Sequence, residues 1–365
     1  MTLREASPAG LPGAGHLART SAVLTAFLRE QTTHLRDIVG ADDELWSSMM
    51  SDIERFIAGG KRLRPEFCYW GWRAAGGAGD GDIVVRASAA LELLHAFALV
   101  HDDIIDDSDI RRGSPTVHRH GADLHSRMGL RGRAADFGTA VAILIGDLCL
   151  AWYHDMLDSC ALGPEQRRAV RRLSSQTFAE LIAGQYLDLA EQGSRHLSMD
   201  RSWKVIAYKT SKYTIERPMQ LGGILAAGDP MIVDSYSRYA VPLGEAFQLR
   251  DDILGAFGDP AVTGKPDGDD LRTGKGTVLL ATTRKLADDT ARRTIDELLS
   301  RETMTDEDVA RLREIMVETG AVTIVEERIG EQAQAAASAA EDMPVDAVVR
   351  DALRDLVTRT AFRDR

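Results

Sequence analysis

Cysteine is scarce in this chain of 365 residues. The three cysteines, Cys68, Cys149 and Cys160, do not stand at the short spacing that is typical of a metal site. The N-terminal residues lack the apolar core of a secretion signal, and an odd number of cysteines is typical of reduced thiols. We therefore expect a cytoplasmic protein without structural disulfides.

Long apolar runs and positive charge are also lacking. No apolar run reaches about 18 residues without a charge, which is the length that a membrane span needs. Lys and Arg number 44 against 56 Asp and Glu, so the formal net charge is −12. Because binding to nucleic acid depends on a positively charged surface, this balance argues against a nucleic acid partner. We expect neither a membrane span nor binding to nucleic acid.

The alternation of apolar and polar residues that marks β-strands is absent, whereas apolar residues at three- and four-residue steps recur along the chain. They fill the segments 19–39, 42–58, 83–105, 134–159, 164–190, 231–257, 277–300 and 305–340. Three breaks rich in glycine and proline, at 76–79, 108–133 and 258–276, are too local to be interdomain linkers. The pattern predicts an all-α fold, with a flexible N-terminus at 1–18 and one domain at 19–365.

A first cluster of carboxylates follows the apolar run LLHAFALV. It holds five aspartates in eight residues, Asp102, Asp103, Asp106, Asp107 and Asp109. On a helix Asp102 and Asp106 share a face, and like charges at that spacing repel unless cations offset them. Hard oxygen ligands at this spacing suit Mg²⁺. An acidic, solvated helix end is the alternative, and the apolar helix that leads into the cluster favours the metal.

A second cluster, Asp251 and Asp252, lies between the sequences GEAFQLR and ILGAFGD. Taken alone, it would be an ordinary acidic helix end, although carboxylates at a helix C-terminus oppose the helix dipole. Its likeness to the first cluster favours joint metal binding.

Basic residues recur along the chain, at Lys61, Arg64, Arg111, Arg112, Lys209 and Lys265. Each of them alone is more often a surface cation. Arginine binds diphosphate oxygens through forked hydrogen bonds, and lysine binds them as a point charge. With the two acidic clusters, these residues indicate two anionic substrates, one bridged by Mg²⁺ and the other held by cations alone.

In these residues the sequence resembles the trans-isoprenyl diphosphate synthases, the polyprenyl synthetase family. The matching segments keep a consistent order over roughly residues 20–340. They are GGKRLRP at 59–65, DDIID at 102–106 with RRGSPTVH after it, GQYLDL at 184–189, KT at 209–210, FQLRDDILGAFGD at 247–259 and GK at 264–265. The resemblance implies a bundle of ten or more helices around a deep central cavity, normally in a homodimer.

The resemblance also implies a role for each matching residue. Asp102 and Asp106 match the ligands of two Mg²⁺ ions and Asp251 matches the ligand of a third, with Asp103 and Asp252 beside them in catalysis. The isopentenyl diphosphate site is matched by Gly60, Lys61, Arg64, His95 and Arg112. The allylic diphosphate site is matched by Arg111, Lys209, Thr210, Gln248 and Lys265, of which Lys209 also counts as catalytic. Gln185 and Asp188 match a polar pair that lines the cavity.

The second motif departs from the family pattern, because Gly255 stands where a full DDxxD motif has its last aspartate. We expect activity to survive, with less hydrogen-bonding support around the third metal. The implied reaction is ionisation of an allylic diphosphate, attack by the isopentenyl double bond and loss of a proton. Mg²⁺ ions and cations lower its barrier by stabilising charge on the departing pyrophosphate.

Product length is implied by Phe97 and Ala98, which stand five and four positions before Asp102. At about 1.5 Å per residue, Phe97 lies roughly 7.5 Å down the helix from the metal site. In the family, an aromatic residue at the fifth position with a small residue at the fourth resembles the C20 pattern. We predict geranylgeranyl diphosphate as the product, with farnesyl diphosphate as the second candidate and a C25 product third.

Three other functions stay open. A class I terpene cyclase shares a helical cavity and a DDxxD motif, but it should carry an Asn/Ser/Glu metal motif where Asp251 and Asp252 stand. A non-catalytic subunit of a heteromeric synthase often loses acidic residues that both clusters keep here. An acidic helical binding protein does not explain basic residues at the matching intervals.

Overall fold

The computed structural model describes residues 13–40, 44–78, 81–192, 198–258, 268–301 and 303–363. In these residues the chain is helical apart from its connections and one short hairpin, so the all-α prediction is confirmed. The chain divides into two compact units. Unit 1 comprises Met1–Arg167 and Leu221–Gly228, and unit 2 comprises Arg168–Gln220 and Asp229–Arg365. The single domain at 19–365 stays a prediction.

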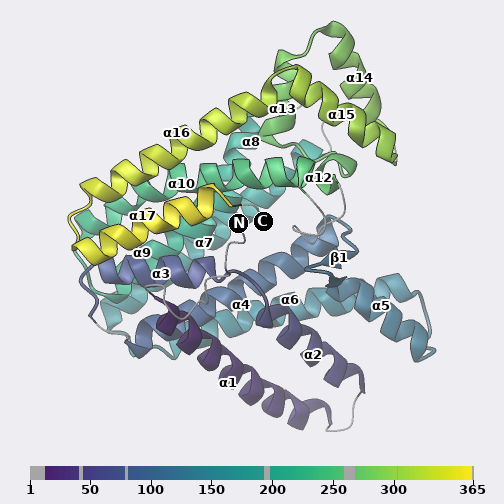
Figure 1. The fold of residues 1–365 in the computed structure, drawn as a ribbon. Coiled ribbons are helices and arrows are strands. Elements are labelled where there is room, and N and C mark those ends of the chain that lie inside the picture. The colour runs from purple at the N-terminus through teal and green to yellow at the C-terminus, as the bar shows by residue number, and fades with distance from the viewer. Residues whose placement is uncertain are drawn as a thin grey trace, which may run out of the picture. The chain divides into compact units, whose positions relative to one another are not determined.

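Unit 1 is built around one apolar helix. Its helices are α1 (Ala14–Val39), α2 (Glu44–Ala58), α3 (Leu63–Ala74), α4 (Asp82–Ile105), α5 (Val117–Arg127) and α6 (Ala134–Asp158). Helix α4 packs against α1, α3 and α6, and it runs beside α6 in Figure 1. Because neighbours cover α4 on several sides, apolar residues such as Leu93 and Leu94 are buried around much of its circumference. Helix α1 begins at Ala14, five residues before the expected start.

A two-residue hairpin interrupts the expected break at 108–133. Strands β1 (Ile110–Arg111) and β2 (Ser114–Pro115) pair antiparallel. The two residues between them, Arg112 and Gly113, both have left-handed backbones, with φ of 54° and 74°. Two such residues form the tight turn that matches the twist of a hairpin. This short hairpin leaves the all-α class unchanged, and α5 follows in the same break.

Unit 2 is built around α10 (Pro230–Phe257). Its other elements are α7 (Pro164–Gln192, from Arg168 on), α8 (Met199–Val205), the π-helix η2 (Ile206–Glu216), α9 (Arg217–Leu225, as far as Gln220), α12 (Asp269–Arg272), α13 (Val278–Leu286), α14 (Asp289–Leu299), α15 (Asp306–Glu318), α16 (Ala321–Asp342) and α17 (Ala347–Ala361). Helix α10 packs against η2, α16 and α17, and Figure 1 shows it alongside the last two. The rings of Tyr236 and Tyr239 are fully buried in this core.

Two segments that were expected as single helices are each divided. The segment 277–300 breaks before Asp288, whose side chain accepts hydrogen bonds from the backbone N–H groups of Thr290 (3.0 Å) and Ala291 (2.8 Å) and so starts α14. The segment 305–340 breaks at Gly320, which has a φ of +75°. An aspartate N-cap and a left-handed glycine are ordinary helix boundary signals.

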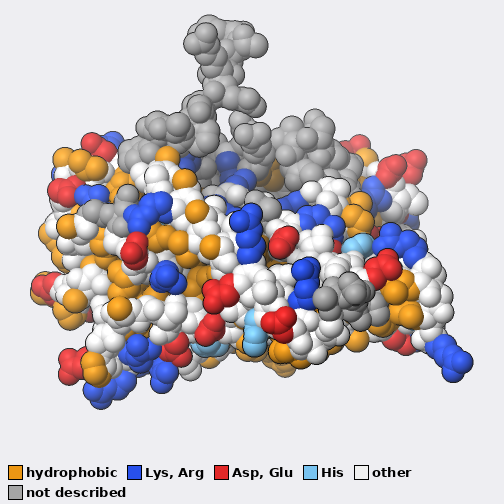
Figure 2. Space-filling model, turned by 90° about the horizontal axis from the view of Figure 1, so that it is seen from below, with side chains coloured by type: hydrophobic (Ala, Val, Ile, Leu, Met, Phe, Trp, Pro, Cys, Tyr) orange, Lys and Arg blue, Asp and Glu red, His pale blue; other side chains and the backbone are white. Residues whose placement is uncertain are grey.

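The surface carries charges of both signs. On the face drawn in Figure 2, basic and acidic side chains are interspersed. Helices α4 and α6 are long and apolar enough to cross a membrane by length and composition alone. The most apolar window of α4 is 67% buried inside the protein, whereas that of α6 is 28% buried. Ile143 and Leu144 are among the apolar side chains that α6 exposes.

Candidate active site

In the hairpin of unit 1, two adjacent arginines bond to different partners. Arg111 lies in the strand and bonds Asp103 through both Nε, at 2.8 Å from Oδ1, and Nη2. Arg112 occupies the turn, and its Nη1 donates to the carbonyl oxygen of Phe56 (3.1 Å). The turn thus gives the two arginines different partners, and their assignment to different substrates stays a prediction.

The first acidic motif lies where α4 ends. The backbone N–H of Asp106 donates to the carbonyl oxygen of Asp102 (2.8 Å), which keeps these two residues one turn apart. Asp103 is 1% exposed and faces Arg111, whereas the side chain of Asp102 is 16% exposed. Burial raises the pKa of Asp103, and the adjacent Arg111 guanidinium opposes that rise. Asp103 therefore holds Arg111, and Asp102 and Asp106 are the more accessible carboxylates.

Around His95, in contrast to the acidic motif, positive charge predominates. Burial, and then the positive charges of four arginines, keep the pKa of His95 well below its usual value; in decreasing order they are Arg64, Arg112, Arg111 and Arg62. The imidazole is therefore neutral at neutral pH. Arg62 itself pairs with Glu92 and donates to the carbonyl oxygen of Ile57 (2.6 Å).

Glycine is needed beside this cluster. Gly60 has a φ of +110°, and a Cβ built on it would lie 2.7 Å from Nη2 of Arg112. A larger residue at position 60 would displace that guanidinium. Lys61, the next residue, is exposed. The GGKRLRP segment thus presents one exposed cation and lets Arg112 lie against its backbone.

The two residues expected to limit product length lie on α4 before the acidic motif. Phe97 and Ala98 are partly exposed. The ring of Phe97 meets the ring of His101 edge-on, with centroids 4.8 Å apart. The ring of Phe97 is therefore held in contact with His101, the residue before Asp102.

In unit 2 the π-helix η2 presents Lys209 to α7. Nζ of Lys209 donates to Oδ2 of Asp188 at 2.7 Å, and Asp188 is buried. Gln185 is partly exposed one turn earlier on α7. π-Helical turns are frequent at functional sites, because the wider turn redirects side chains. The expected polar residue Asp188 is thus the partner that orients Lys209.

Thr210, Gln248 and Asp252 form a hydrogen-bonded series from η2 to α10. The Thr210 hydroxyl donates to Oε1 of Gln248 (2.6 Å), and Nε2 of Gln248 donates to Oδ1 of Asp252 (2.9 Å). Burial raises the pKa of Asp252 to about 7, although the bond from Gln248 opposes the rise. Asp252 is therefore a buried support, while its neighbour Asp251 is 40% exposed.

Two residues that the sequence did not point to contact this motif. Arg363, near the end of the chain, pairs with Asp251. Asp270 on α12 lies against Gly255, and a Cβ on that glycine would be 1.9 Å from Oδ2 of Asp270. The carboxylate of Asp270 thus lies close to the position where a full DDxxD motif would begin its last side chain.

The comparisons with known proteins agree with these motifs. The family model for polyprenyl synthetase matches residues 47–316. The chain belongs to this family. A geranylfarnesyl diphosphate synthase from Aeropyrum pernix is 33% identical over 274 residues, which cover 74% of this chain and 80% of that enzyme. A geranylgeranyl diphosphate synthase from Saccharolobus solfataricus is 33% identical over 263 residues, 72% of this chain and 74% of that enzyme.

A solved polyprenyl synthetase structure is similar over nearly the whole chain. It is a geranylgeranyl pyrophosphate synthase from Corynebacterium glutamicum, complexed with isoprenyl diphosphate and magnesium. It has a TM-score of 0.88 and 36% sequence identity, and the match covers 94% of this chain and 99% of that one. The chain is accordingly a prenyltransferase of the prenyl diphosphate synthase type.

The polyprenyl synthetase motifs offer oxygen ligands without a preformed cage. In the part of the chain that the structure describes, no three side chains of His, Cys, Asp or Glu converge on one point. Oδ2 of Asp103 is buried and has no hydrogen-bond partner among the described residues. Mg²⁺ commonly takes one or two carboxylates and completes its ligands with water and substrate phosphate. The carboxylates present therefore fit Mg²⁺.

Lys265, which the sequence assigns to the allylic diphosphate site, lies outside the described residues.

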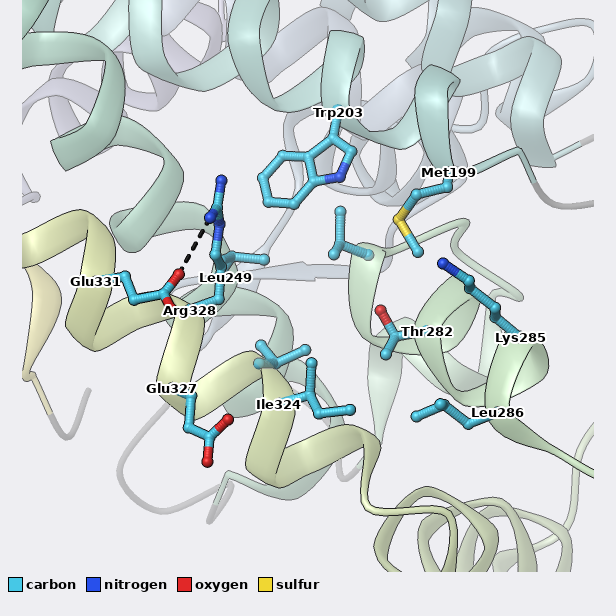
Figure 3. A pocket seen from close by; sticks show the side chains of 12 residues that line it. Met199, Trp203, Leu249, Thr282, Lys285, Leu286, Ile324, Glu327, Arg328 and Glu331 are labelled. Carbon is cyan, nitrogen blue, oxygen red and sulfur yellow. Dashed lines mark hydrogen bonds and ion pairs between the residues drawn. The ribbon is translucent and has the colours of Figure 1, made fainter.

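A pocket of about 380 Å³ in unit 2 is lined by Leu249 from the segment FQLRDDILGAFGD and otherwise by residues outside the matching motifs. Figure 3 shows Met199 and Trp203 on one side of it and α13 and α16 around the rest. At its rim the guanidinium of Arg328 pairs with Glu331 (3.1 Å) and lies 5.8 Å from the Trp203 ring centroid. None of the site residues expected from the sequence lines this pocket.

Proposed function

We propose that the chain condenses isopentenyl diphosphate with allylic diphosphates (dimethylallyl, geranyl and farnesyl) and that its main product is geranylgeranyl diphosphate. The observation that carries the proposal is the gathering of arginines around a neutral histidine on the helix that bears the first acidic motif. A diphosphate bound there needs no metal, because guanidinium groups supply the countercharge. A metal-free site beside an acidic motif suits an enzyme with two diphosphate substrates.

The isopentenyl diphosphate site is formed by Gly60, Lys61, Arg64, His95 and Arg112. Because the pKa of His95 is held low, its neutral ring offers a single N–H to a diphosphate oxygen. Arg112 is braced against the carbonyl oxygen of Phe56, so it is oriented before substrate binds. This site binds and orients the nucleophilic substrate.

The residues proposed to bind the allylic diphosphate are those that match the family motifs, Arg111, Lys209, Thr210, Gln248 and Lys265, together with Gln185. Asp103 holds Arg111 and Asp188 holds Lys209, so both cations are fixed by buried carboxylates. Donors fixed in this way stabilise the charge that develops on the departing pyrophosphate without having to reorient.

The proposed ligands of three Mg²⁺ ions are Asp102 and Asp106 in unit 1 and Asp251 in unit 2. When bound, Mg²⁺ supplies electrostatic stabilisation of the leaving pyrophosphate. Asp252 contributes as a buried neighbour of Asp251, through the hydrogen bond that it accepts from Gln248. The Corynebacterium glutamicum relative was crystallised with magnesium, which supports this choice of cation.

The proposal includes a cytoplasmic homodimer. Helix α6 exposes Ile143 and Leu144, and α7 exposes Ile182, Tyr186 and Leu189. Exposed apolar residues on one helix face are typical of protein interfaces. The three cysteines are buried and unpaired, which suits a reducing compartment. Sedimentation equilibrium tests this part: a dimer mass is expected, and a monomer at micromolar concentration would contradict it.

A product assay tests the proposed activity. Purified protein is incubated with Mg²⁺, labelled isopentenyl diphosphate and each allylic starter in turn, and the dephosphorylated alcohols are sized. A dominant C20 alcohol is expected. A C15 or C25 alcohol would retain the enzyme class and reject geranylgeranyl diphosphate as product. No elongation by folded protein would reject the activity.

The Ala98→Phe variant tests how product length is set. A phenyl group at position 98 would shorten the space below the acidic motif, so the product should shift from C20 towards C15. The Ala89→Ser variant, at a buried position farther from the motif on α4, is the matched control. An unchanged product distribution from Ala98→Phe would reject the roles of Phe97 and Ala98.

A further inference from the structure

Helix α17 and the residues that follow it, as far as Arg363, are fixed against α10. Helix α17 packs on α10 and α16, and the hydroxyl of Tyr239 donates to the carbonyl oxygen of Leu353 (2.9 Å). Nε of Arg250 donates to the carbonyl oxygen of Ala361 (3.2 Å), while its two Nη atoms bond Glu326 of α16 at 2.7 Å each. These bonds hold the backbone two residues before Arg363.

Arg363 lies over the face of α10 that carries Asp251. Its guanidinium carbon is 3.8 Å from the centroid of the Phe247 ring, and its Nη2 approaches the carbonyl oxygen of Phe247 at 3.5 Å. The same guanidinium pairs with the carboxylate of Asp251. Phe247 and Asp251 are four residues apart on the helix, so one planar side chain can contact both.

The surroundings of this contact make it replaceable. The side chain of Arg363 is 10% exposed, whereas that of Asp251 is 40% exposed. Nε of Arg363 is buried and has no hydrogen-bond partner among the described residues. Asp251 therefore keeps an accessible side, and the hydrogen-bonding capacity of Arg363 is only partly used.

We infer that Arg363 is a built-in countercation for Asp251, which neutralises this carboxylate in the metal-free chain and is displaced from it when a divalent cation binds. The inference rests on the proposed function, because it takes Asp251 to be a metal ligand. A guanidinium and a divalent cation compete for the same carboxylate charge. On this inference, binding of the metal breaks the contact between Arg363 and Asp251, and removal of Arg363 should tighten metal binding.

Titration with Mn²⁺ in the presence of inorganic pyrophosphate tests the inference. Mn²⁺ accepts the same oxygen ligands as Mg²⁺ and is detected by paramagnetic resonance. The Arg363→Gln variant should bind Mn²⁺ about threefold to tenfold more tightly than the wild type, as expected for loss of a partly exposed ion pair. The matched control is Arg359→Gln, because Arg359 pairs with Asp355 on its own helix at 2.6 Å. Unchanged or weaker binding by Arg363→Gln would overturn the inference.

An Asp251→Asn variant separates this inference from the proposed function. If Asp251→Asn binds Mn²⁺ as the wild type does, Asp251 is not a metal ligand and both proposals fail. If Asp251→Asn loses metal while Arg363→Gln binds like the wild type, only the role of Arg363 fails. A chain that ends at Phe362 should reproduce the tighter binding of Arg363→Gln.

Amide hydrogen exchange gives a second readout that does not depend on affinity. The N–H of Phe362 donates to the carbonyl oxygen of Thr358 (3.1 Å), so its exchange reports whether the segment before Arg363 stays in place. Addition of Mg²⁺ and pyrophosphate should speed exchange at residues 359–363 in the wild type. Exchange that is unchanged or slowed by these additions would contradict displacement of Arg363.

Discussion

The two acidic motifs differ in where their countercharge comes from. In unit 1, Asp103 is paired with Arg111, which is eight residues away and held by a two-residue turn. In unit 2, Asp251 is paired with Arg363, which stands 112 residues later, after α17. In the first pair the carboxylate is 1% exposed and its arginine is near in sequence, whereas in the second the carboxylate is 40% exposed and its arginine is distant. The comparison indicates a permanent support in one motif and an exchangeable one in the other.

Loss of a proposed metal ligand should have the largest effect. The Asp102→Asn variant keeps the shape of the side chain but lowers its negative charge, so elongation should fall on the order of 10³-fold. The elongation activity of Asp251→Asn should also fall steeply, if both motifs serve one reaction. The measurement is kcat/KM with farnesyl diphosphate, with circular dichroism as the control for folding. Activity within about threefold of wild type in either variant would show that its motif is dispensable.

The two arginines should differ in their effect on stability. Arg111→Met leaves Asp103 buried without its partner, which should cost about 3–5 kcal/mol of unfolding free energy. Arg363→Met removes a partly exposed pair and should cost less than about 1 kcal/mol. Urea unfolding of both variants measures the difference. Equal losses would contradict the contrast between a buried pair and an exchangeable one.

Restoring the full second motif should harm the protein. In Gly255→Asp the new Cβ would lie 1.9 Å from Oδ2 of Asp270, and the added carboxylate would repel the one already there. The expected loss is about 1–3 kcal/mol of stability, as for other overpacked sites. The double variant Gly255→Asp with Asp270→Gly should recover much of it. If Gly255→Asp alone is as stable as the wild type, Asp270 does not occupy the space next to position 255.

His95 should give the smallest effect on stability at neutral pH, and this effect should grow as the pH falls. Its pKa is lower in the folded chain than in the unfolded chain, so the unfolded chain binds more protons below about pH 6.5. The stability present above that pH should therefore fall as the pH drops, by at most about 1.4 kcal/mol per pH unit. His95→Gln should lack this slope in urea unfolding between about pH 5 and 7. Parallel curves for wild type and variant would contradict the neutral histidine.

Sequence reasoning predicted the fold where helices were amphipathic or long. Helices α4, α6, α7 and α10 lie within a few residues of their expected bounds. Helix α3 was missed because it is buried on nearly every side, with Phe67, Trp70 and Trp72 all below 6% exposure, so it has no polar face to give a periodic pattern. Helix α5 was missed because its glycine and histidine residues stand inside a segment that looked like a loop.

The candidate site was predictable as far as its contacts are local in the chain or belong to the matching motifs. Arg111 with Asp103 and Lys209 with Asp188 all stand in segments that the sequence singled out. Arg363 and Asp270 contact the second motif but stand outside it in the sequence, and no spacing rule connects such positions. The absence of the last aspartate at Gly255 was visible, but the side chain that fills the space there was not.

The most direct test of the central claim is the number of Mn²⁺ ions bound per chain in the presence of inorganic pyrophosphate, for wild type, Asp102→Asn and Asp251→Asn. If both motifs hold metal for one leaving pyrophosphate, the wild type should bind three ions, and each variant should bind fewer. Loss of ions from Asp102→Asn alone, with Asp251→Asn like the wild type, would contradict a second motif that holds metal.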